Sequence, residues 1–155
     1  MNVFGLPEIA LIGLVSSVLM TLCEFYFWKK WGMEGTADWQ VNSVIVSTLI
    51  GKIKEPKKTG LWWTITSQLS HGVAAGMAFW LLFQLFKPVL FTSSMIIFVT
   101  IAYGIGLWFL FLVLGRRSFE SLGRIRITGQ GLMRSLLSLA IYGFFLGLLL
   151  STFHF

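Results

Sequence analysis

The sequence is poor in charge and nearly free of cysteine. Only 12% of its 155 residues are charged and 56% are hydrophobic, whereas a soluble domain carries about twice that charged fraction. A chain this short cannot hide so much apolar sequence from water, so its solvent must be lipid. The single cysteine, Cys23, excludes an internal disulfide and a cysteine-based zinc site.

Positive charge is missing ahead of the first apolar run. The opening residues, MNVFGLPEIA, contain no Lys or Arg, whereas a secretory signal peptide begins with a positive region. We therefore expect the first segment to be a retained helix with its amino terminus outside. The formal net charge of +6 is confined to short clusters between apolar runs, which indicates membrane topology and not a nucleic-acid surface.

The apolar runs predict one all-α membrane domain, a four-transmembrane-helix bundle with a short interfacial helix. We expect the spans over residues 7–28, 60–86, 92–114 and 132–153. Pro7 and Glu8 suit the first turn of a helix. Gly13, Ser16, Ser17 and Met20 lie at helical spacing and predict a face of the first span that packs closely on another helix.

The connections between the spans carry weaker signals. Residues 39–50 repeat apolar side chains at helical spacing after a potential N-cap at Asp38, which predicts an amphipathic helix lying at the membrane surface. Three glycines between Arg116 and Arg134 disfavour a long continuous helix in the last connection.

The distribution of Lys and Arg predicts the orientation. The connection between the first two spans holds six Lys, the next holds only Lys87, and the last holds five Arg. Because cytoplasmic loops carry the excess of positive residues, we expect the first and third connections in the cytoplasm and both termini outside the plasma membrane.

The second and fourth spans share a pattern of small and polar residues. The following pairs align: Gly72 with Gly143, Gly76 with Gly147, His71 with Tyr142, Ser67 with Ser138, and Thr64 with Ser135. A parallel repeat of two helical hairpins produces such an echo. Close helix packing through Gly-x-x-x-Gly steps produces it too, so both explanations stay open.

Two ionisable residues inside the predicted spans are candidate functional groups. His71 lies near the middle of its span, where it could relay a proton, bind a metal or contact a polar ligand. The structural alternative is a neutral His that bonds a hydroxyl or a backbone carbonyl of a neighbouring helix. Glu24 lies one to two turns from the cytoplasmic surface and needs a partner or a proton; Arg134 is the expected ion-pair partner, and Gln68 lies at similar depth.

A metal or cofactor site is not predicted. Cys23, Glu24, His71 and Met77 are residue types that transition metals accept, but they are scattered without paired spacing. The glycines near Gln130 do not match a phosphate loop, which ends in Gly-Lys-Ser or Gly-Lys-Thr after a strand.

One stretch of the chain carries a family resemblance. Met20–Thr21–Leu22 with Glu24, Trp28–Lys29–Lys30–Trp31–Gly32, Gly35, Asp38–Trp39 and Asn42 form a pattern over about the first quarter of the chain. The pattern resembles poorly characterised four-helix membrane proteins of archaea, including ammonia-oxidising archaea. The resemblance implies four spans and an archaeal plasma membrane, and it implies neither a known activity nor a catalytic residue.

These observations favour two functions. The first is a non-catalytic membrane subunit or scaffold of a larger complex, and the resemblance suggests a membrane oxidoreductase as one host. The second is a small homo-oligomeric transporter or channel with His71 and Glu24 lining its path. The expected partners are the lipid bilayer and other membrane subunits or further copies of the chain. A membrane enzyme is least favoured because no nucleophile–base set is visible.

Overall fold

The described part of the chain is almost entirely helical. The computed structural model describes residues 5–31, 36–49, 61–86, 93–123 and 125–154. The elements in chain order are α1 (Leu6–Trp31), α2 (Ala37–Leu49), α3 (Leu61–Phe86), α4 (Ser93–Leu107), the π-helical segment η3 (Trp108–Leu114), α5 (Arg116–Gly123) and α6 (Gly129–His154). The described residues contain no strand, so the all-α prediction is confirmed for them.

Three helical segments are long and apolar enough to cross a membrane by length and composition. They are Leu6–Tyr26 of α1, Ser94–Leu114 of α4 and η3, and Gly129–Thr152 of α6. α3 has 26 residues but is not among them, because its first half carries a run of polar side chains from Thr64 to His71. The helices are therefore compatible with a membrane bundle, but the predicted second span over residues 60–86, and with it the four-span bundle, is not confirmed.

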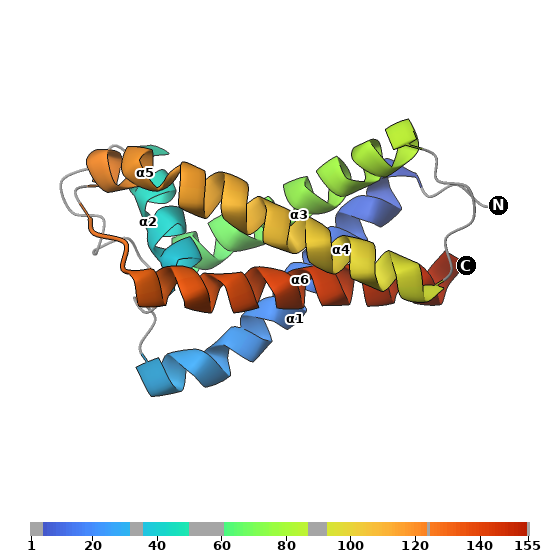
Figure 1. The fold of residues 1–155 in the computed structure, drawn as a ribbon, viewed down its shortest axis with the longest axis horizontal. Helices are drawn as coiled ribbons and strands as arrows, with labels where there is room; N and C mark the ends of the chain where they lie inside the picture. Colours follow the sequence, from blue (N-terminus) through green and yellow to red (C-terminus); the bar gives the residue numbers. More distant parts are fainter. Residues whose placement is uncertain (1–4, 32–35, 50–60, 87–92, 124, 155) are drawn as a thin grey trace.

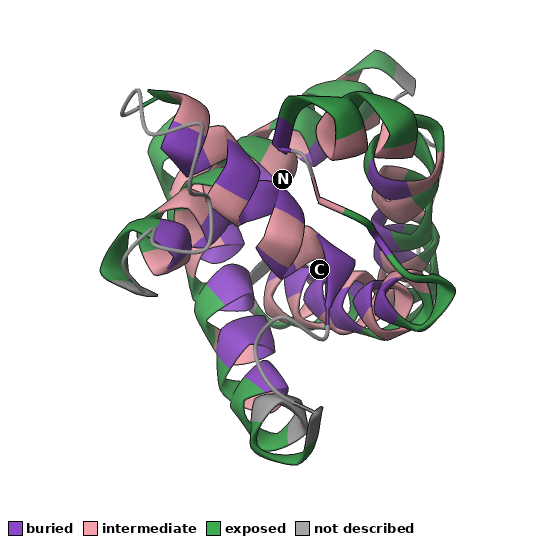
Figure 2. Cartoon of the chain, turned by 90° about the vertical axis from the view of Figure 1, so that its left-hand side faces the viewer, coloured by how far each residue is buried: buried purple, intermediate pink, exposed green. Residues whose placement is uncertain are grey.

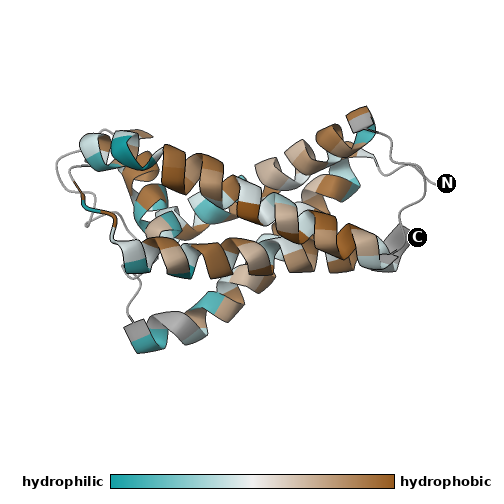
Figure 3. Cartoon of the chain, in the orientation of Figure 1, coloured by the Kyte–Doolittle hydropathy of each residue, from teal (hydrophilic) through white to brown (hydrophobic). Residues whose placement is uncertain are grey.

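The long helices form two packed pairs. α1 packs against α3, α4 packs against α6, and α1 also contacts α6. The short helices α2 and α5 lie together at one end of the bundle, and the start of α1 and the end of α6 lie at the opposite end (Figure 1). Hydrophilic residues gather at the end that holds α2 and α5, whereas α4 and α6 are mostly hydrophobic along their length (Figure 3). Buried residues lie on the sides of the helices that face one another (Figure 2).

The helix after α1 is more buried than the predicted surface helix. α2 packs against α3, α6 and α5, so it lies inside the end of the bundle. Its buried residues fall on several faces: Ala37, Trp39, Val41, Asn42, Val44, Val46 and Ser47. A helix lying on a membrane surface would keep its polar side toward water. The range of α2 is close to the predicted 39–50, and its position at the membrane interface stays a prediction.

Glycine allows α1 and α3 to approach closely, as the small-residue face predicted. A Cβ atom added at Gly13 of α1 would lie 2.7 Å from the carbonyl oxygen of Gly72 on α3. A Cβ atom at Gly76 would lie 2.9 Å from the Cα atom of Gly13. Ser16 and Ser17, on the same side of α1, are fully buried. The Gly-x-x-x-Gly step of α3 is thus a packing element.

The aligned glycines of α6 have the same role in the other pair. A Cβ atom at Gly143 would collide with the carbonyl oxygen of Thr100 on α4, and one at Gly147 would collide with the Thr100 side chain. Each Gly-x-x-x-Gly step therefore holds the second helix of a pair against the first. A repeat and simple close packing both account for this contact, so the repeat stays a hypothesis.

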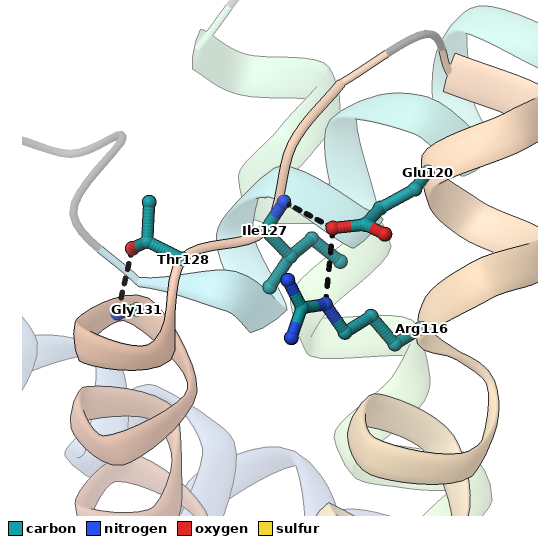
Figure 4. Close-up of polar contacts among 5 residues, drawn as sticks. All are labelled: Arg116, Glu120, Ile127, Thr128 and Gly131. Atoms are coloured by element: carbon teal, nitrogen blue, oxygen red, sulfur yellow. Dashed lines mark hydrogen bonds and ion pairs between the residues drawn. The ribbon is translucent and has the colours of Figure 1, made fainter.

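A hydrogen-bonded connection joins α5 to α6 (Figure 4). One carboxylate oxygen of Glu120 accepts a hydrogen bond from Arg116 Nε at 3.0 Å and from the Ile127 amide at 2.8 Å. The Thr128 hydroxyl accepts from the Gly131 amide at 3.0 Å and so caps α6. This cap explains why α6 begins at Gly129, three residues before the predicted boundary at 132, despite its two early glycines.

Two glycines of α4 provide a matched test of close packing. A Cβ atom at Gly104 would collide with the Leu139 carbonyl oxygen, whereas one at Gly106 meets nothing within 4 Å. We expect Gly104→Ala to lower the free energy of unfolding by about 1–3 kcal/mol through overpacking. Gly106→Ala should change it little or raise it, because Ala favours helix. Thermal unfolding in detergent checks this, and equal effects of the two substitutions would contradict the packing.

The α5–α6 connection should depend on pH. The hydrogen bonds from Arg116 and then from the Ile127 amide lower the pKa of Glu120 below its usual value of 4.5. A lowered pKa adds stability above the unfolded-state pKa, and this stability is lost as the pH falls through the lower folded-state value. We expect the difference in Tm between wild type and Glu120→Gln to shrink below about pH 4.5. A difference that is the same at neutral and acidic pH would show that the ionised carboxylate does not hold the connection.

Candidate functional site

Glu24 is the centre of a polar cluster inside the bundle. It lies within the apolar segment of α1, and its side chain is fully buried. Gln68 of α3 donates through Nε2 to Glu24 Oε2 at 2.7 Å and to the Thr21 hydroxyl oxygen at 3.2 Å. The side chains of Asp38 on α2 and Ser138 on α6 also lie close to the Glu24 carboxyl group. Four helices therefore meet at the Glu24 carboxyl group. We call Glu24 and the residues around it, Gln68, Thr21, Asp38 and Ser138, the polar centre.

The partner predicted for Glu24 was Arg134. The contacts of Glu24 that the structure describes are with Gln68, Asp38 and Ser138, and the expected ion pair with Arg134 is not among them. Asp38 brings a second carboxyl group close to Glu24 in place of a positive charge. The polar centre is thus held by an amide and a second carboxyl group, at the depth where the sequence had suggested Gln68 as the other candidate.

A serine of α6 holds the start of α2. The Ser135 hydroxyl oxygen accepts from the Ala37 amide at 2.7 Å and from the Asp38 amide at 3.0 Å. The same hydroxyl donates to Asp38 Oδ1 at 2.6 Å. Asp38 lies inside the first turn, so its predicted role as N-cap is wrong. Ser135 binds the free amides at the start of α2 from another helix, and in doing so it orients the Asp38 carboxyl group.

His71 is bonded to the same short helix. Its Nδ1 lies 2.6 Å from Asn42 Oδ1, and the Ser67 hydroxyl donates to that oxygen at 3.1 Å. An amide oxygen can only accept, so in this amide orientation Nδ1 carries the hydrogen and Nε2 is the remaining ring nitrogen. The sequence analysis offered a neutral His71 bonded to a neighbouring helix as the alternative to a functional His71. The structure shows such a bond, but its partner is an asparagine side chain and not the expected hydroxyl or backbone carbonyl.

A cavity of about 390 Å³ adjoins the polar centre. Its walls are mainly apolar, and Asp38, Asn42, Gln68 and His71 supply polar groups. Tyr103 and Tyr142 also line it, but their hydroxyls donate to the carbonyl oxygens of Ala75 and Gly72, at 2.8 and 2.7 Å. The exposed lining residues His71, Ala74, Ala78 and Phe111 belong to α3 and η3. The cavity is therefore open at the side of the bundle between α3 and η3.

The π-helical segment η3 shapes one wall of this cavity. Phe111 and Leu112 of η3 line it, and Trp108 at the start of η3 donates through Nε1 to the Leu132 carbonyl oxygen at 2.8 Å. Wide π-turns inside α-helices occur frequently at functional sites. The sequence predicted the span over residues 92–114 but gave no sign of this local widening.

The polar centre has more hydrogen-bond acceptors than donors. Glu24 Oε1 and Gln68 Oε1 are both buried, and neither has a hydrogen-bond partner among the described residues. Buried polar atoms are rarely left unpaired, so such atoms call for an explanation. The arrangement suits a proton, a cation or a ligand that carries N–H or O–H groups. No group of three potential metal-ligating His, Cys, Asp or Glu side chains occurs within the described ranges.

Sequence reasoning missed Asp38 and Asn42 as members of the site. Their spacing of four residues puts both side chains on one face of a helix, and both belong to the pattern that carried the family resemblance. Because α2 was predicted to lie at the membrane surface, we expected the face with Asp38 and Asn42 to contact water. A buried polar cavity and bulk water select the same residue types, so periodicity alone does not distinguish them.

Comparison with known proteins gives no match: no family model, curated protein or solved structure is significantly similar to the chain. The resemblance to archaeal four-helix proteins stays a prediction. The function is therefore argued from the chemistry of the polar centre and the cavity.

The hydrogen bond between Glu24 and Gln68 should show as coupling between the two residues. Gln68→Leu leaves the buried Glu24 carboxyl without its amide donor, which should lower the free energy of unfolding by about 1–3 kcal/mol. Adding Glu24→Leu should recover part of this loss, because removal of both partners costs less than removal of one. Gln84→Leu is the control, since Gln84 lies on the same helix outside the cavity lining. Additive effects in this double-mutant cycle would contradict the interaction.

Proposed function

We propose that the chain crosses the membrane four times, with α3 as the second span. The support is that polar groups of α3 find partners within the protein, which membrane-embedded polar groups require. The Thr66 and Ser70 hydroxyls donate to the carbonyl oxygens of Trp62 and Thr66, at 2.9 and 2.8 Å. Gln68 bonds α1 and His71 bonds α2. Low hydropathy is therefore no obstacle to a membrane position.

In this topology both termini lie outside the plasma membrane, and the end that holds α2 and α5 faces the cytoplasm. The basic residues of the sequence are concentrated in the two connections at that end, as the positive-inside rule requires. The origin in an archaeal plasma membrane rests on the family resemblance alone.

For function, we propose a small transporter or channel whose path runs through the polar centre. The observation that carries this proposal is the fully buried Glu24, which is bonded to Gln68 and lies close to Asp38 beside an open cavity. An ionisable group inside a membrane is costly and typically belongs to a substrate path or a proton relay. A group kept only for packing would not need a second carboxyl group in contact with it.

Proton flux into proteoliposomes tests this function. We expect the wild-type protein to dissipate an imposed pH gradient faster than empty liposomes, with valinomycin and K⁺ present to clamp the voltage. Glu24→Gln removes the titratable group and should return the rate to that of empty liposomes, and His71→Ala should slow it. Glu8→Gln is the control, because Glu8 is an exposed carboxyl in the first turn of the same helix. Equal rates for wild type, Glu24→Gln and His71→Ala would contradict a path through these residues.

A second candidate is a subunit or scaffold of a larger membrane complex. The observation in its favour is the exposed apolar face of α4 and η3, where the exposed fractions reach 73% for Phe98 and 60% for Leu110. Such a face suits lipid or the helices of a partner. Native mass spectrometry after mild extraction separates the two: other named subunits in stable stoichiometry support this candidate, and a lone chain or homo-oligomer contradicts it.

A further inference from the structure

We infer that the cavity beside the polar centre binds a lipophilic amine, meaning an apolar body with a protonated ammonium head group. This inference names a substrate class for the transport function proposed above and rests on the same polar centre. It follows from three properties of the cavity: the apolar character of its walls, the side on which it opens, and the hydrogen-bonding character of its polar end.

The walls and the opening favour a molecule that arrives from the lipid. Ligand pockets of about 300–1,000 Å³ hold drug-sized molecules, and this cavity has a volume of about 390 Å³. Its walls include Met20, Ile45, Leu107 and Leu139. Because it opens between α3 and η3, an apolar molecule could enter it from the side of the bundle without crossing water.

The polar end favours a head group that donates hydrogen bonds and carries positive charge. Asp38 and His71 line the cavity there, and the described residues of the lining include no Lys or Arg. The nitrogen of His71 that Asn42 leaves unbonded, Nε2, is an acceptor in that tautomer. Gln68, which is 3% exposed and also lines the cavity, holds an Oε1 without a partner among the described residues.

Charge complementarity selects an ammonium group over other head groups. Asp38 is the one acidic residue among the described lining residues, and an ammonium group would pair with its carboxylate. A phosphate or carboxylate head group would meet that negative charge without a lining cation to balance it. An alcohol would supply a single donor and no charge, whereas a primary ammonium group supplies three donors.

The test compares three probes that share one apolar body. We expect 4-phenylbutylammonium to bind the purified wild-type protein at least about tenfold more tightly than 4-phenylbutanol, which lacks the charge. It should likewise bind more tightly than 4-phenylbutyltrimethylammonium, which keeps the charge and lacks N–H donors. Isothermal titration in detergent measures all three. If the trimethyl analogue or the alcohol binds as tightly as the primary ammonium, the inference is wrong.

A matched pair of variants locates the site without disturbing the polar centre. Ala78 lines the cavity and is exposed, and Ala102 is an exposed alanine of α4 outside the lining. We expect Ala78→Phe to fill the cavity and weaken 4-phenylbutylammonium binding at least about tenfold, while Ala102→Phe leaves it unchanged. Asp38→Asn should weaken binding as well, provided that its unfolding temperature stays near that of wild type. Equal binding by Ala78→Phe and Ala102→Phe would place the ligand elsewhere and overturn the inference.

The outcomes separate this inference from the proposed function. Ammonium binding with the expected selectivity, together with no flux of any kind, would leave the binding site standing and remove transport. Proton flux that depends on Glu24, together with no selective ammonium binding, would support transport and remove the lipophilic amine as its substrate.

Discussion

The structure depends on the constraint that a carboxyl group inside a lipid-facing bundle must have partners. Glu24 cannot reach water from its buried position, so its partners have to come from the protein. Gln68 supplies an amide donor from α3, and α2 brings Asp38 close to the carboxyl group. The short helix α2 is therefore best understood as a polar insert that closes one end of the bundle. Its position in turn depends on Ser135, which binds its first amides from α6.

The same constraint explains how the proposed second span, α3, can carry polar side chains. Along its first half, the polar side chains bond backward to the helix itself, inward to α1, or sideways to α2. Its second half exposes Leu81, Leu82 and Leu85, which suit lipid. The helix thus changes character along its length, from polar beside the cavity to apolar near its end. A hydropathy average over the whole segment hides this division.

Sequence reasoning located the helices but could not identify their contacts. The apolar runs predicted the four long helices within a few residues, and the small-residue steps at Gly72 and Gly143 marked real points of close approach. These features are local, because one continuous stretch of sequence determines both a helix and the face on which it packs. The contact between Ser135 and Asp38 joins residues 97 positions apart, and no single segment encodes it. Charge pairing suggested Arg134 for Glu24, whereas the folded chain brings an uncharged amide and another acid to it.

The position of α2 shows most clearly where sequence patterns lose information. The polar residues Asp38 and Asn42, with apolar residues between them, predict a helix with one face toward a polar environment. Water at a membrane surface and a polar cavity inside the bundle both satisfy that pattern, and only the packing against α3 and α6 distinguishes them. Residues of all seven helical elements line the cavity, so it depends on the arrangement of the whole bundle and not on any local motif.

The central claim is that α3 spans the membrane and that α2 and α5 lie together on the cytoplasmic side. Cysteine accessibility in a Cys23→Ser background tests it most directly, with single cysteines at Ser94, the exposed start of α4, and at Ser121, an exposed position of α5. An impermeant maleimide added to right-side-out vesicles should label Ser94→Cys and leave Ser121→Cys unlabelled, and inverted vesicles should give the reverse. Labelling of Ser94→Cys only from the cytoplasmic side would show that α3 does not cross, and would contradict the four-span account.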